Sequence, residues 1–152
     1  MRTRRVIGTM LAATLVVGLL AIATPASALR LDAELIGPNE VPDPGDPDGM
    51  GVARVRLNVA AERVCYAISV EDITLPATAA HIHRGSAGVA GPPKITLNAP
   101  TEVGTSGTGI SFGCEDDVSK RLLRRIRANP DRFYVNVHNE DYPDGAIRGQ
   151  LG

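Results

Sequence analysis

The sequence predicts an all-β fold, an antiparallel sandwich or barrel of about eight short strands with one inserted helix. Three observations predict this class. Aliphatic and polar residues alternate along most of the chain, which is typical of half-buried strands. Clusters of Gly, Pro, Asn and Asp interrupt the alternating segments roughly every 8–12 residues, as in sandwiches and barrels. One late segment has a helical repeat instead.

The first 28 residues are expected to be a removable export signal. Three arginines precede an apolar run, and Ala26-Ser27-Ala28 has the small-residue pattern that signal peptidase cleaves. The run is about long enough to span a bilayer. However, the small-residue exit without a basic stop favours cleavage over a membrane anchor. The pair Arg4-Arg5 leaves twin-arginine export open as an alternative to the general route.

Residues 29–152 are expected to form one domain that works outside the cytoplasm, secreted or in the cell envelope. Loss of residues 1–28 removes three arginines and leaves 124 residues, with 13 basic and 17 acidic side chains and a formal net charge of −4. Such a mildly acidic domain is a poor candidate for binding nucleic acid. It contains no second apolar run, so no membrane span is expected after cleavage of the signal. The expected partner is an extracellular protein or a small ligand.

Cys65 and Cys114 are the only cysteines. An even number in an exported chain predicts a disulfide; two buried thiols or two metal-ligating thiols are the alternatives. The aliphatic core is thin, because the chain has three Tyr, two Phe and no Trp. A bridge closing a loop of about 50 residues would add roughly 4 kcal/mol of stability.

Each predicted element follows from its local pattern. Strands are expected at residues 29–35, 52–60, 63–72, 78–83, 94–98, 105–114, 132–139 and 146–151. Residues 37–51 are too rich in Pro, Gly and Asp to be other than a loop.

The helix is predicted at residues 116–130, where apolar residues recur at helical spacing. Asp116 or Asp117 is expected to cap its start, and Asn129-Pro130 to end it. Its run of arginines is either a binding patch or, as we favour, the solvated face of an amphipathic helix.

All three histidines lie in two predicted strands. His81 and His83 are two positions apart, so both side chains point to one face, away from the core residue Ile82. His138 also lies on a non-core face, and each histidine is at the C-terminal end of its strand. If the two strands are neighbours, the imidazoles can converge. Three neutral imidazoles with an open fourth position form a recognised zinc or copper site.

Other interpretations of these polar residues remain open. The histidines could be polar rim residues that bond only to backbone and loops. Glu140, Asp141 and Asp144 could supply a further ligand or orient a ring. Glu40 and Arg148 are expected to form a buried ion pair that locks the 37–51 loop to the last strand; the alternative for Arg148 is a substrate anchor. We find no Ser or Cys nucleophile beside a base.

Three segments carry a family resemblance: GPNEVP, TAAHIHRGSAGVAGPP and FYVNVHNEDYPDGAIRGQL. They resemble the CHRD domain, which is named from chordin and is widespread in secreted bacterial proteins. The likeness covers residues 30–151 and implies an immunoglobulin-like antiparallel β-barrel, with a distant similarity to copper/zinc superoxide dismutases. In animal chordin such domains belong to an extracellular growth-factor antagonist. For stand-alone bacterial members the resemblance implies no agreed activity.

The dismutase comparison reaches only the histidines. His81 and His83 look like its H-x-H copper ligands, and His138 like its late-strand histidine. A dismutase uses more histidines, one of them bridging copper and zinc, and this chain has none left. A complete two-metal site is therefore excluded, whereas a single three-histidine site is not.

Three functions follow, in order of preference. The first is a non-enzymatic extracellular binding or structural module. The second is a copper- or zinc-binding protein that uses His81, His83 and His138 for buffering, delivery or sensing. The third is a redox or hydrolytic enzyme that uses the same metal.

Overall fold

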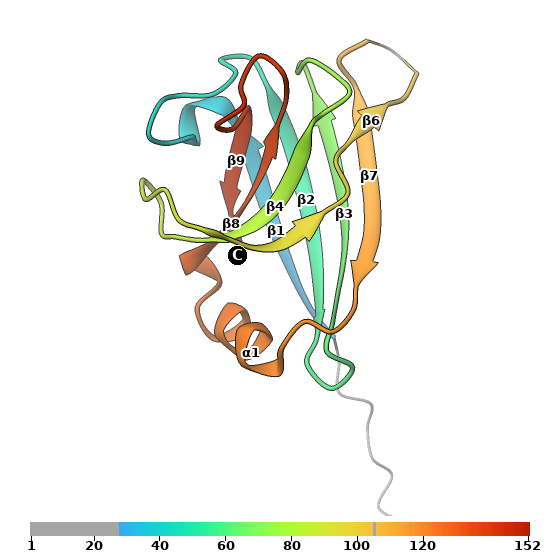
Figure 1. Cartoon of the computed structure of the whole chain (residues 1–152), viewed down its shortest axis with the longest axis vertical. Helices are drawn as coiled ribbons and strands as arrows, with labels where there is room; N and C mark the ends of the chain where they lie inside the picture. Colours follow the sequence, from blue (N-terminus) through green and yellow to red (C-terminus); the bar gives the residue numbers. More distant parts are fainter. Residues whose placement is uncertain (1–27, 105) are drawn as a thin grey trace, which may run out of the picture.

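The computed structural model describes residues 28–104 and 106–152, so nearly all of the predicted signal segment lies outside the described residues. Nine strands form one antiparallel sheet in the order β5-β4-β8-β9-β1-β2-β3-β7-β6 (Figure 1). They are β1 (Leu29–Ile36), β2 (Met50–Asn58), β3 (Arg63–Glu71), β4 (Ala79–Arg84), β5 (Pro93–Leu97), β6 (Thr101–Glu102), β7 (Gly109–Glu115), β8 (Phe133–His138) and β9 (Ile147–Gln150). The predicted all-β fold with one inserted helix is confirmed, and the additional strand is the two-residue β6.

The sheet curls into a partly closed barrel. In Figure 1, β4 and β5 lie in front of β2 and β3. Its two ends approach where the segment after β5 meets β3 and β7. The Asn98 side chain donates to the carbonyl of Phe112 at 3.3 Å, and its backbone N–H donates to the Tyr66 hydroxyl at 2.7 Å. The barrel is thus bridged at this seam by individual hydrogen bonds instead of a long strand ladder.

The core fills the inside of the curled sheet. Alternate residues of the strands are buried, as the period of two predicts, and they join one apolar cluster with the helix. Among the described residues, Phe133 and Tyr66 are the aromatic members of this cluster. Most of the buried apolar area therefore comes from Leu, Ile, Val and Ala.

The disulfide between Cys65 and Cys114 is present. The two residues face each other directly in the β3–β7 pair. Val64 and Tyr66, on either side of Cys65, belong to the core, so the bridge lies on the outer face of the sheet. It therefore cross-links the strands without filling any core volume.

The helix α1 (Lys120–Ala128) packs against one end of the barrel through Leu123 and Ile126, both fully buried. Its basic side chains are all exposed, which fits the solvated face of an amphipathic helix. Among the described residues, no helix has the length and apolar character needed to cross a bilayer.

The predicted aspartate cap of this helix was wrong. Ser119 is the N-cap, and its hydroxyl accepts a hydrogen bond from the Leu122 N–H at 3.3 Å. Asp116 is held instead by Arg63 at the start of β3, and Asp117 turns the chain with a left-handed φ of 59°. These contacts delay the helix start by several residues.

Replacing Ser119 with alanine is expected to lower the free energy of unfolding by about 1 kcal/mol, because the Leu122 N–H loses its side-chain acceptor. Urea denaturation of the two proteins measures this change. Ser119→Thr keeps the hydroxyl and should lose much less. Equal losses in both variants would contradict the capping role.

Candidate metal centre

Strands β4 and β8 are neighbours, which is the condition for the three histidines to meet. Because the strands are antiparallel, their C-terminal ends lie at opposite ends of the pair. His138 is paired with Ala79, and Asn136 with His81, on the same face of the sheet. The histidines therefore converge diagonally across this face, not at a shared end of the two strands.

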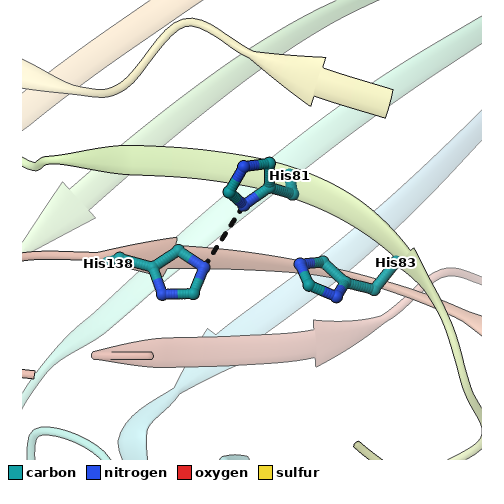
Figure 2. Close-up of side chains that lie close together, drawn as sticks. All are labelled: His81, His83 and His138. Carbon is teal, nitrogen blue, oxygen red and sulfur yellow. Dashed lines mark hydrogen bonds between the residues drawn. The ribbon is translucent and has the colours of Figure 1, made fainter. Parts of the chain in front are cut away.

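The three imidazoles lie together on the outer face (Figure 2). One ring nitrogen from each lies within 4.8 Å of the other two. The Nδ1 of His81 is 3.3 Å from the Nε2 of His138. Two nitrogens bound to one tetrahedral metal at about 2.0–2.1 Å are about 3.3 Å apart. This pair is thus already at ligand spacing, and a ring nitrogen of His83 lies within 4.8 Å of a ring nitrogen of each of the other two.

Backbone carbonyls select which nitrogen of two of the rings is available. The Nδ1 of His83 is 2.7 Å from the Gly91 carbonyl oxygen, and the Nδ1 of His138 is 3.0 Å from that of Pro143. A carbonyl only accepts, so both Nδ1 atoms carry the hydrogen and both Nε2 atoms present a lone pair. The Nε2 of His83 is buried without a hydrogen-bond partner among the described residues.

His81 is hydrogen-bonded to His138. Since the Nε2 of His138 is an acceptor, the Nδ1 of His81 donates to it across 3.3 Å. Neutral imidazole can move its hydrogen from Nδ1 to Nε2. After that change, His81 presents a third lone pair beside the other two, so the donor set fits a metal ion.

The electrostatic setting keeps the rings neutral. Burial lowers the pKa of His81, His83 and His138 below 6.5, and the neighbouring rings lower that of His81 further. The Asp144 charge acts the other way on the pKa of His138. Neutral imidazole is the form that binds metals, so no protons have to be removed near pH 7.

The cluster opens on one side to a surface hollow of about 530 Å³. His81 and His138 line this hollow with Asn139 and Glu140, whereas His83 lies deeper and is only 8% exposed. Asp141, which the sequence offered as a possible further ligand, accepts a hydrogen bond from Thr74. Among the described residues, the group of potential ligand atoms contains the three histidines and no carboxylate. A small molecule or water can therefore reach a fourth position from the hollow.

The sequence model of the CHRD domain matches residues 31–151. The chain belongs to the CHRD family. All three histidines and both cysteines lie within the matched region of this CHRD domain. No curated protein and no solved structure matches the chain.

Arg148 of the CHRD domain lies on β9, the strand next to β8, and is only 1% exposed. Its guanidinium carbon is 3.4 Å from the centre of the Tyr134 ring. Its Nη2 donates to the carbonyl oxygens of Ser86 and Val89, both at 3.0 Å. Arg148 therefore ties the loop between β4 and β5 to the sheet.

The expected direct ion pair between Glu40 and Arg148 is not formed. Among the described residues, the salt bridges within 4.0 Å join Arg54 to Asp32 and Arg63 to Asp116. Arg148 has turned its Nη2 to loop carbonyls, so its charge acts on Glu40 only from farther away.

Glu40 is itself buried, with 5% exposure. Burial raises its pKa from 4.5 to about 7; the charge of Arg148 and hydrogen bonds from Asn136 and the Val41 backbone oppose this rise. Gly145 passes so close that a Cβ there would lie 2.4 Å from the Glu40 carboxyl carbon. Glu40 is therefore a tightly enclosed acid that is partly protonated near neutral pH.

Sequence reasoning missed the residues that hold the histidines. Alternation along β8 places Tyr134 and Asn136 on the face of His138, but it predicts exposed side chains there. In the CHRD domain both are buried, at 3% and 2% exposure, because loops cover that face. The carbonyls of Gly91 and Pro143 gave no sequence signal, since every residue has one.

Proposed function

We propose that this protein is an exported CHRD domain that binds one copper or zinc ion through His81, His83 and His138. The observation that carries the proposal is the cluster of three ring nitrogens within 4.8 Å, with two rings held through Nδ1 by backbone carbonyls. Hydrogen bonds of this kind orient ligating histidines in metal proteins. Imidazole nitrogens suit both zinc and copper.

The role proposed first is binding of the ion, and catalysis at the same ion is the second candidate. The bound metal would supply a Lewis acid, and the surface hollow lined by His81 and His138 would admit an exchangeable fourth ligand. An exchangeable ligand suits uptake and release of the ion, and so buffering, delivery or sensing. The disulfide supports export, because such bonds persist in oxidising compartments.

The test is a metal titration of residues 29–152 produced with the disulfide formed and stripped of metal. Calorimetry with Zn²⁺ and, separately, Cu²⁺ should give one ion per chain. His83→Ala should weaken binding by more than about 100-fold, since one of three ligands is lost and even residues that only orient a ligand contribute about 10–100-fold. The chain has three histidines in all, so no other histidine can replace the lost ligand.

Glu140→Gln is the matched control. Glu140 lines the hollow but lies outside the histidine cluster, so this variant should bind as the parent does. If the parent takes up neither ion, or if His83→Ala binds as tightly as the parent, the metal proposal is wrong and a structural or protein-binding module remains. Redox or hydrolytic turnover by the loaded protein would instead support the enzymatic alternative.

A further inference from the structure

We propose that Tyr134, clamped by Arg148, is the positioning residue that presets His83 as a metal ligand, an inference that rests on the proposed metal-binding function. Among the described residues, Tyr134 is not a member of the group of potential metal ligands. It acts on the ring plane of His83 and on which nitrogen of that ring carries the hydrogen.

The Tyr134 ring is in contact with His83 and with Arg148. Its β4 neighbour is His83, and the two rings stack with centroids 4.9 Å apart and an angle of 18° between planes. On β9 it is paired with Gln150, and Arg148, two residues earlier in β9, places its guanidinium carbon 3.4 Å from the ring centre. A cation this close occupies one ring face, so the imidazole takes the other. The three side chains form a column that fixes the tilt of His83.

The hydroxyl of Tyr134 acts on the same histidine through Gly91. The Gly91 N–H donates to the hydroxyl at 3.2 Å, and the hydroxyl is 3.3 Å from the Gly91 carbonyl oxygen. That carbonyl also accepts the Nδ1 hydrogen of His83 at 2.7 Å. Tyr134 therefore holds the acceptor that leaves the Nε2 of His83 free for metal.

The loop that carries Gly91 is held closely against the sheet. A Cβ on Gly91 would lie 1.8 Å from the carbonyl oxygen of Arg84, so the loop passes directly against β4. Arg148 holds the loop again at Ser86 and Val89. The loop thus depends on the same Arg148 that clamps Tyr134.

A purely packing role for Tyr134 is disfavoured by its location. Tyr134 is 3% exposed, yet it lies outside the apolar core cluster, to which the adjacent Phe133 and Val135 belong. Its contacts with His83, Gly91 and Arg148 lie on the outer face, among the polar groups that surround the histidines.

Two variants separate the two contributions of Tyr134. Tyr134→Phe keeps the ring stack and loses the hydrogen bonds to Gly91; it should weaken Zn²⁺ binding about 10-fold. Tyr134→Leu loses the stack as well and should weaken it about 100-fold. The matched control is Tyr66→Phe, because the Tyr66 hydroxyl also accepts from a loop N–H, that of Asn98, but Tyr66 belongs to the core, on the face of the sheet opposite the histidines. The control should lose stability but not affinity.

A second readout needs no metal. Long-range ¹H–¹⁵N NMR of the metal-free protein should find His83 as the Nδ1–H tautomer in the parent and as a mixture of tautomers in Tyr134→Leu. Unchanged affinity together with an unchanged tautomer in both Tyr134 variants would overturn the proposal. If the parent binds no Zn²⁺ or Cu²⁺, the proposed function fails, and the tautomer measurement alone decides whether Tyr134 positions His83.

Discussion

Replacing both Cys65 and Cys114 with alanine is expected to lower the free energy of unfolding by about 4 kcal/mol. The cysteines are 49 positions apart, so the bridge removes much of the freedom of the unfolded chain. In the folded protein the bridge lies on the outer face between directly paired residues. Its loss opens no core cavity, and the effect should therefore come mainly from the unfolded state.

Urea denaturation at pH 7 of the oxidised parent and the double variant measures the difference. Reductant should lower the stability of the parent to nearly that of the variant and leave the variant unchanged. Cys114 is exposed, so reductant can reach the bridge without prior unfolding. A difference below about 1 kcal/mol would contradict this role of the bridge.

Glu40→Gln is expected to remove a large part of the pH dependence of stability between pH 4.5 and pH 8. The folded protein raises the Glu40 pKa from 4.5 to about 7, so over this range the folded state keeps a proton that the unfolded state has released. The resulting stabilisation is complete below pH 4.5 and is lost as the pH rises through 7. Its size is about 2 to 3 kcal/mol, allowing for some solvent screening of the carboxylate.

The measurement is the difference in unfolding free energy between the parent and Glu40→Gln at intervals from pH 4.5 to 8. This difference should shift in favour of the glutamine variant as the pH rises. The lowered histidine pKa values produce the opposite trend, but they do so in both proteins and cancel in the difference. Glu34→Gln, at an exposed position of β1, is the control and should show no shift. A flat difference for Glu40→Gln would mean that the carboxyl is solvated.

Proton linkage at Glu40 also bears on the candidate metal site. The Asn136 side chain lowers the pKa of Glu40, and the same residue is paired with His81 across the β4–β8 ladder. Asn136 is therefore the residue that relates the enclosed acid to the strand of the histidines. Comparing Zn²⁺ affinity in the Glu40→Gln variant at pH 5.5 and pH 8 would detect any coupling between them.

Much of the local structure was predictable from the sequence, because it depends on neighbours along the chain. Alternation with period two located the long strands and placed His81 and His83 on the face opposite Ile82. Turn residues located the loops, and an even number of cysteines in an export context predicted the bridge. The helix start was wrong because Arg63, distant in sequence, holds Asp116.

The tertiary structure alone decided which strands lie side by side and what covers their outer face. Alternation assigns a side chain to a face but does not choose the neighbouring strand, so the diagonal meeting of His138 with His81 needed the β4–β8 pairing. The Gly91 carbonyl reaches His83, and the Ser86 carbonyl reaches Arg148, only because the loop between β4 and β5 folds back on the sheet. Periodicity reports burial along one segment, whereas a site depends on distances between segments that the chain connects only through its fold.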